Sequence, residues 1–228
     1  MYKRQAVILV GENGHFSFAP FGIGLALYVM GGALIDLIER TGLARLPFRV
    51  AVSRARGLPR SAWGGGLAHF GIGLTLLGIV CEAHWGAERI VNLSPSQSVA
   101  LRHYELTLEG IVPRQGPNYR EQVARFSVRK EGTALGMLEP SKRTFPTRNM
   151  TTTEAALLTR GASQLYVSLG ELGADGSIAV RIYHKPLVLL IWLGALVMAL
   201  GGALSLSDRR LRVGAPKPAA KAHLAAAE

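Results

Sequence analysis

The stretch AWGGGLAHFGIGLTLLGIVC, residues 62–81, decides the fold of this chain. It carries no charged residue and has the length of a helix that crosses a lipid bilayer. Its one readily titratable interior group is His69. An ionisable side chain inside a membrane span is costly, so its presence indicates a function by default.

The surroundings of His69 admit two interpretations. On a helix, its neighbours three and four positions away are Gly65, Gly66, Ile72 and Gly73. Three of these four are glycines, which leaves one side of the imidazole bare for a large flat ligand. Alternatively, the glycines allow close helix packing and His69 is hydrogen-bonded to a neighbouring helix. These residues alone leave both interpretations open.

Two further apolar runs accompany this stretch. Residues 17–35 and 187–206 are also uncharged and long enough to span a bilayer. A polar stretch of roughly a hundred residues separates the second run from the third. We therefore predict an α-helical integral membrane protein with three transmembrane helices and an inserted small antiparallel β domain outside the cytoplasm.

The net charge of +11 is mainly a topology signal. Six arginines lie in the short loop between the first two runs: Arg40, Arg45, Arg49, Arg54, Arg56 and Arg60. Five more basic residues follow the third run: Arg209, Arg210, Arg212, Lys217 and Lys221. Short basic segments beside spans mark the cytoplasmic side. Because the charge is concentrated there, we expect no nucleic-acid partner and a membrane lipid environment.

These patterns divide the chain into seven segments. They are an unassigned N-terminal segment 1–16, a transmembrane helix 17–38, a cytoplasmic basic loop 39–61, a transmembrane helix 62–83 with His69, a periplasmic β-domain 84–184, a transmembrane helix 185–207 and a cytoplasmic tail 208–228. The proline- and alanine-rich tail is expected to be disordered.

Alternating apolar and polar residues predict strands in the polar stretch. The expected core positions are Leu106, Leu108, Phe126, Val128, Val167, Val180 and Ile182. Glu131 and Gly132 form a turn signal between two strands, whereas residues 153–159 (TEAALLT) favour a short helix. Five or six short strands of this kind indicate a small sheet or a partly closed barrel.

Other candidate sites carry weaker signals, and no catalytic residue is assigned. The single cysteine, Cys81, excludes an intrachain disulfide and CxxC redox chemistry. Four other histidines outside the spans, His15, His84, His103 and His184, lack metal-ligand spacing, and His223 lies in the tail. Six residues suggest an exposed basic surface for a partner, or a scattered solvated face: Tyr119, Arg120, Arg125, Lys142, Arg143 and Arg148.

Three long segments resemble a known family. They are LEPSKRTFPTRNMTTTEAALLTRGASQLYVSLGE (138–171), RIYHKPLVLLIWLGALVMALGGALSLSDRRLR (181–212) and WGGGLAHFGIGLTLLGI (63–79). Together they resemble the C-terminal part of the cytochrome c maturation haem lyase subunit of the CcmF/NrfE type. The likeness extends over roughly residues 16–213.

The resemblance implies a multi-pass protein of the bacterial inner membrane. It implies that His69 is one axial ligand of a b-type haem (haem b), with Gly65, Gly66 and Gly73 on the haem-facing surface. The second axial ligand would come from a segment not in this chain. The implied partners are the remaining N-terminal portion of the haem lyase, a haem chaperone, and apocytochrome c with its thiol-handling subunits. Haem-ligation activity is then expected of the full complex and not of this chain alone.

Two other functions remain open on the residues. One is a membrane-anchored periplasmic binding or scaffold module without haem, in which His69 is structural. The other is a piece of a transporter, which is the weaker alternative because no acidic relay residues lie in the middle of the membrane.

Overall fold

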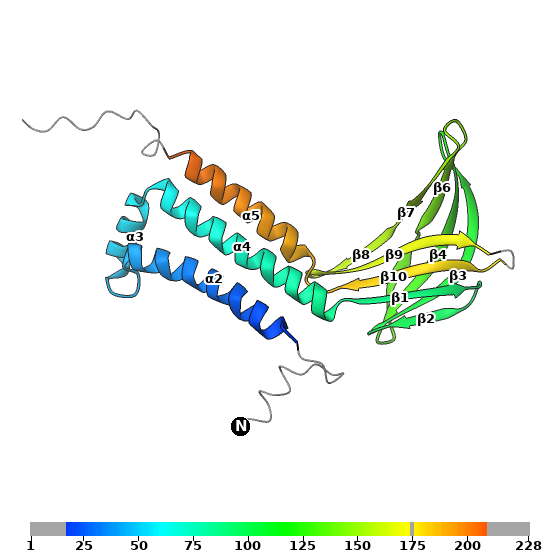
Figure 1. The fold of residues 1–228 in the computed structure, drawn as a ribbon, viewed down its shortest axis with the longest axis horizontal. Coiled ribbons are helices and arrows are strands. Elements are labelled where there is room, and N and C mark those ends of the chain that lie inside the picture. The colour runs from blue at the N-terminus through cyan, green and yellow to red at the C-terminus, as the bar shows by residue number, and fades with distance from the viewer. Residues whose placement is uncertain (1–16, 174–175, 209–228) are drawn as a thin grey trace, which may run out of the picture. The chain divides into compact units, whose positions relative to one another are not determined.

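The computed structural model of the protein describes residues 17–173 and 176–208. The described helices are α2 (Ala19–Thr41), α3 (Phe48–Gly57), α4 (Arg60–Trp85) and α5 (Leu189–Leu206) (Figure 1). Of these, α2, α4 and α5 are long and apolar enough to cross a membrane, as the three apolar runs predict. The segment 1–16 and the tail beyond 208 lie outside the described residues.

Two compact units make up the chain. One is formed by Met1–Ala26 and Leu74–Leu193, and it contains every strand of the described residues. The other is formed by Leu27–Gly73 and Gly194–Glu228, and it contains α3 with the adjoining parts of the long helices.

Helix α2 ends at a glycine in the left-handed conformation. Gly42 has φ +72°, a conformation that a side chain would disfavour. The Gly42 amide donates to Glu39 O at 3.1 Å, and the Leu43 amide donates to Ile38 O at 3.1 Å. This pair of bonds satisfies carbonyls that the end of the helix leaves without partners. The chain is thereby turned into the basic loop.

The basic loop contains the helix α3, which the sequence analysis did not predict. The segment begins after Pro47 and ends before Leu58, whose φ of −62° and ψ of 140° are extended because Pro59 follows. The indole N–H of Trp63 donates to Ala55 O at 3.2 Å and ties α3 to α4. Packing against α4 therefore helps to hold a helix too short to be stable alone.

A seven-residue glycine repeat brings α4 and α5 into backbone contact. Gly64, Gly71 and Gly78 recur along one face of α4. At each position an added Cβ would lie 2.5–2.9 Å from atoms of α5, namely Gly201 O, Gly194 O and Ile191 N. Small residues at this spacing allow membrane helices to approach closely.

The C-terminal end of α5 also holds the start of α4. Asp208 Oδ2 accepts hydrogen bonds from the amide and hydroxyl of Ser61, at 3.0 and 2.9 Å. A carboxylate is favourable there because the first amides of a helix have no intrahelical acceptor. The two helices are therefore linked by polar bonds as well as by packing.

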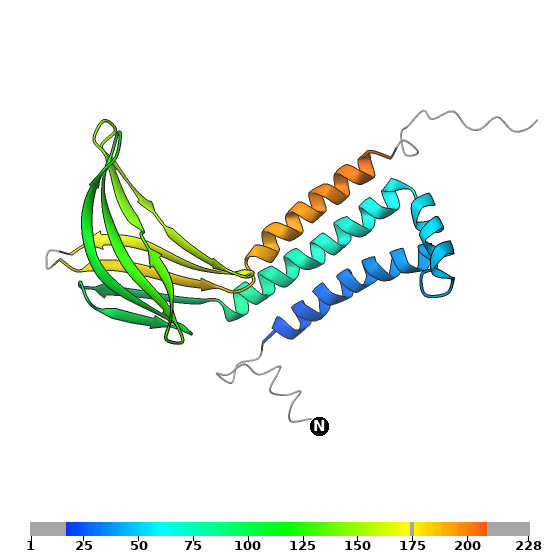
Figure 2. The ribbon, with the colours of Figure 1, turned by 180° about the vertical axis from the view of Figure 1, so that it is seen from behind.

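The polar stretch forms a β-sandwich of antiparallel strands. One sheet contains β1 (Ala87–Leu93), β10 (Ile178–Lys185), β9 (Ser163–Leu172) and β8 (Ala156–Arg160), in that order. The other contains β2 (Ser98–Leu101), β3 (Tyr104–Gln115), β4 (Arg120–Lys130), β6 (Ser141–Phe145) and β7 (Met150–Glu154), with β5 (Thr133–Leu138) pairing to β4. The two sheets are visible from both sides in Figures 1 and 2.

The core of the sandwich lies where the alternation predicts it. All seven expected core residues are at most 1% exposed: Leu106, Leu108, Phe126, Val128, Val167, Val180 and Ile182. Glu131 and Gly132 form the predicted turn, both at positive φ. The domain is thus confirmed as antiparallel β, although the described residues contain ten strands and not five or six.

The prediction of a short helix at residues 153–159 is wrong. The segment belongs to strands β7 and β8, with only Ala155 between them. Its residues have good helix propensity, but an isolated helix this short is marginal. Pairing with β6 and β9 satisfies the backbone instead. Because these partners belong to different sheets, the chain changes sheet at Ala155.

Candidate functional site

His69 lies on an exposed face of α4, near the middle of the helix. Its Nδ1 is 2.8 Å from Gly65 O in the preceding turn. A carbonyl oxygen only accepts, so Nδ1 is the donor in this bond. In the neutral imidazole the lone pair then resides on Nε2. Among the described residues, no group hydrogen-bonds Nε2, and the ring is not bonded to another helix.

The three glycines near His69 have different surroundings. An added Cβ at Gly65 would meet nothing within 4 Å, so the space beside the imidazole is open. At Gly66 it would lie 2.8 Å from Leu37 Cδ1, which places Gly66 in the contact with α2. Gly73 is buried. Gly65 is therefore the glycine that borders the free side of His69.

The other described histidines differ in their contacts. The Ser17 hydroxyl is 3.2 Å from His84 Nδ1, and His103 Nδ1 is 3.1 Å from a carboxylate oxygen of Glu131. His184 Nδ1 is buried without a hydrogen-bond partner among the described residues. Burial and the nearby positive charge of Arg102 lower the pKa of His184. The described residues contain no cluster of three or more metal-ligating side chains.

A buried carboxylate anchors one end of the sandwich. Glu121 on β4 is 3% exposed and lies directly between Arg114 on β3 and Arg143 on β6 in the strand register. Arg114 Nε donates to Oε1, and Arg143 Nε donates to Oε2 at 2.9 Å. The Ser141 hydroxyl donates to the same oxygen, Oε2, at 2.8 Å. Cross-strand pairs of this kind stabilise a sheet.

These contacts determine the protonation of Glu121. Burial alone would raise the pKa of its carboxyl, but hydrogen bonds from Arg143, Arg114 and Ser141, with the charge of Arg114, outweigh burial. The pKa therefore falls from 4.5 to about 2. Arg143 also lies 4.7 Å over the ring of Tyr119, which extends the cluster to the tip of the β3–β4 hairpin.

We expect Glu121→Gln to destabilise the sandwich by about 1–3 kcal/mol at neutral pH, because charge-assisted bonds to buried groups are lost. The measurement is thermal unfolding followed by circular dichroism. Glu105→Gln is the control, since Glu105 is exposed on the neighbouring strand β3. Equal midpoints for the two variants would contradict the anchoring role.

The same carboxylate predicts a pH dependence. Its folded-state pKa of about 2 lies below the ordinary value of 4.5. Its stabilising contribution is therefore fully present above pH 4.5 and is lost as the pH falls through 2. Unfolding midpoints at neutral pH and near pH 2 should differ less in Glu121→Gln than in the unchanged protein. An identical acid response in both proteins would contradict the assignment.

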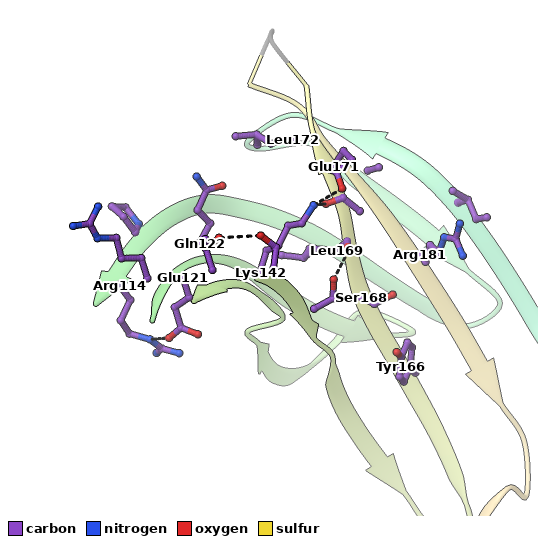
Figure 3. Close-up of a pocket in the computed structure, with 18 of the residues that line it drawn as sticks. Arg114, Glu121, Gln122, Lys142, Tyr166, Ser168, Leu169, Glu171, Leu172 and Arg181 are labelled. Atoms are coloured by element: carbon purple, nitrogen blue, oxygen red, sulfur yellow. Dashed lines mark hydrogen bonds and ion pairs between the residues drawn. The ribbon is translucent and has the colours of Figure 1, made fainter. Parts of the chain in front are cut away.

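A cleft of about 1420 Å³ adjoins this cluster. One wall is formed by the ends of β3 and β4 together with β6 and β7. The other is the outer face of β9 and β10, where Tyr166 and Ser168 alternate with core residues. Figure 3 shows Gln122 and Lys142 on the first wall and Tyr166, Ser168 and Arg181 on the second. Lys142 bridges the walls by an ion pair with Glu171 and a 3.4 Å bond to Gly170 O.

The sandwich is the part of the chain that a family model matches. Residues 84–186 match the family described as the CcmF C-terminal beta-sandwich. The cytochrome c-type biogenesis protein CycK of Bradyrhizobium diazoefficiens is 58% identical over 224 residues, which are 98% of this chain and 34% of CycK. The chain belongs to the CcmF family.

Other members of the family also match most of this chain but only part of their own length. The cytochrome c-type biogenesis proteins CcmF of Pseudomonas aeruginosa and Escherichia coli are 35% and 36% identical, over 92% and 82% of this chain. The alignments cover 32% and 29% of those proteins. The chain therefore spans about a third of the length of the curated CcmF-family proteins it matches.

A solved structure supports the fold. The protein described as cytochrome c heme lyase CcmF matches with a TM-score of 0.66 and 20% identity, over 86% of this chain and 31% of the solved one. At this identity the likeness shows the fold alone. It agrees with spanning helices joined to a β-sandwich.

The cleft and its anchor are not evident from the sequence. Residues 124–128 show clear alternation, which places Glu121 on the polar face of β4. In the structure Glu121 and Val123 are both buried, at the end of β4 that pairs with β6. Of the six residues suggested as a basic surface, Arg120 and Lys142 line the cleft and Arg143 belongs to the anchor. The feature of the sequence that pointed to this region was the density of arginines in segments that form neighbouring strands.

Proposed function

We propose that this chain forms the C-terminal part of a membrane haem lyase that acts in cytochrome c biogenesis. In this proposal His69 is an axial ligand of a b-type haem whose second axial ligand comes from a segment outside this sequence. Haem is passed from a haem chaperone to apocytochrome c with its thiol-handling subunits. The family membership and the printed function of the relatives support the coarser part of the proposal.

The observation that carries the haem assignment is the bond between His69 Nδ1 and Gly65 O. It holds the imidazole in the tautomer that ligates through Nε2, as second-shell carbonyls do for metal-bound histidines. The exposed position of the ring leaves that nitrogen accessible. Bound haem would supply an iron centre for redox chemistry, and this chain's residues would orient one ligand to it.

The helix surface also fits a flat group. Gly65 leaves open space beside the ring, and Ile72 is an exposed apolar neighbour on the same face. Gly66 does not border the ring but lets α4 pack closely against Leu37 of α2, and Gly73 is buried, so neither glycine lies on the open side of His69.

The test is a haem spectrum of an assembled complex. The chain is co-expressed with the remaining N-terminal portion of a CcmF relative, purified through a tag on the chain, and its reduced absorbance is normalised to protein. A b-type spectrum that depends on this chain is expected. A complex that assembles without b-type haem would contradict the proposal and favour the alternative of a binding or scaffold module.

The proposal assigns α3 and the sandwich to opposite sides of the membrane, and labelling can test this assignment. We place α3 in the cytoplasm and the sandwich in the periplasm, because short arginine-rich loops resist translocation. After Cys81→Ala, single cysteines at Ser53 and Asn118 report the two sides, since both positions are exposed. An impermeant thiol reagent added to intact spheroplasts should label only the Asn118 position. Labelling at Ser53 under these conditions would overturn the topology.

A further inference from the structure

The cleft beside the Glu121 cluster is polar on both walls. Hydroxyl groups line it from β6, β7 and β9: Thr144, Thr151, Thr153, Tyr166 and Ser168. Its charged lining residues are four basic and two acidic side chains: Arg114, Arg120, Lys142, Arg181, Glu121 and Glu171. Glu121 is already neutralised by its arginine partners, so the cleft has a basic character.

Two of these cations have no carboxylate partner among the described residues. Arg120 and Arg181 are exposed, lie on opposite walls, and form no ion pair with a described carboxylate. Lys142 is held by Glu171, whose side chain is 92% exposed. The Lys142 side chain is only 21% exposed and stays in place on its wall, whereas the exposed Glu171 carboxylate can be replaced by a carboxylate of a ligand.

The cleft does not have the chemistry of a cofactor pocket. Its volume exceeds the range of about 300–1,000 Å³ that small-molecule pockets occupy. None of the described lining residues is a histidine, cysteine or methionine, so the cleft offers no imidazole or sulfur ligand to a haem iron. A longer polar ligand suits the space better.

We propose that this cleft binds an extended, carboxylate-bearing polypeptide segment of a partner protein. Arg120, Arg181 and Lys142 pair with its side-chain carboxylates from both walls. The hydroxyl rows provide hydrogen-bond donors and acceptors for its backbone. The site is separate from His69, and its occupation does not depend on haem.

The test uses the full chain purified in detergent and a fluorescent peptide of alternating glutamate and serine. Anisotropy should report binding that weakens as salt is added, because exposed charges are screened. The same peptide with glutamine in place of glutamate should bind much more weakly. Inorganic phosphate that supplies the same total negative charge as the peptide should not displace the peptide.

Charge variants identify the site. Arg120→Gln with Arg181→Gln should weaken peptide binding about tenfold, since two exposed pairs are lost. The control is Arg129→Gln with Arg160→Gln, which removes the same charge from exposed strand positions outside the cleft. Glu171→Gln should strengthen binding severalfold because it frees Lys142.

Three results would overturn the proposal. They are equal binding by the two double variants, equal binding of the glutamine peptide, and displacement by inorganic phosphate, which would indicate a small-anion site. None of these results bears on haem content, which is read separately from absorbance. Failure of the cleft proposal is therefore distinguishable from failure of the haem-lyase proposal.

Discussion

Replacing His69 by alanine is expected to lower the b-type haem content of the assembled complex at least tenfold. Loss of an outer-shell partner commonly costs ten- to a hundredfold in metal affinity, and loss of the ligand itself should cost no less. His69→Cys and His69→Met should retain part of the haem with altered spectra, because thiolate and thioether groups also ligate haem iron. Reduced absorbance normalised to protein gives the measurement.

Two control variants separate ligation from packing. His84→Ala removes a histidine from the far end of the same helix, where it contacts Ser17, and should leave haem content unchanged. Gly65→Leu fills the open space beside His69 and should lower haem content without a packing clash inside the chain. Wild-type haem content in His69→Ala, with normal assembly, would eliminate the ligand role.

The second large effect is expected at the contact between α4 and α5. An added Cβ at Gly201 would lie 2.6 Å from Ala68 N and 2.7 Å from Gly64 O. These are backbone atoms, so the helices themselves must separate to accommodate a side chain. Gly201→Leu should therefore lower the free energy of unfolding by about 3 kcal/mol or more. The measurement is thermal unfolding of the protein in detergent.

The adjacent residue provides a matched control. Nothing lies within 4 Å of a Cβ added at Gly202, so Gly202→Leu introduces the same side chain into open space. Its unfolding midpoint should stay close to that of the unchanged protein. If Gly201→Leu and Gly202→Leu unfold at the same temperature, close approach of the two helices does not stabilise the protein.

The three spans and the sandwich core could be predicted from the sequence because each rests on a local pattern. An uncharged run of about twenty residues has the length required to cross a bilayer. Alternation around Phe126 and Val167 assigns one face of each strand to the interior, and both residues are fully buried. His69 was also visible, because a titratable group in an apolar run stands out in the sequence.

Local propensity was misleading where tertiary pairing competed with it. Residues 153–159 favour a helix by composition, yet their backbone pairs with β6 on one side of Ala155 and β9 on the other. Helix α3 is the opposite case, since in the sequence its arginines give only a topology signal. A short segment takes the structure that its neighbours can pair with or pack against.

The sequence by itself determined the class of this protein: spanning helices, an antiparallel domain and one histidine in the interior of a span. Only the tertiary structure decided which helix each glycine contacts and which glycine leaves space open. Gly64 and Gly71 contact α5, Gly66 contacts α2, and Gly65 leaves open the side of His69. It also brought Glu121 between two arginines and formed the cleft beside them. Such arrangements depend on which strands and helix faces meet, and residues far apart in the chain carry no local signal of that.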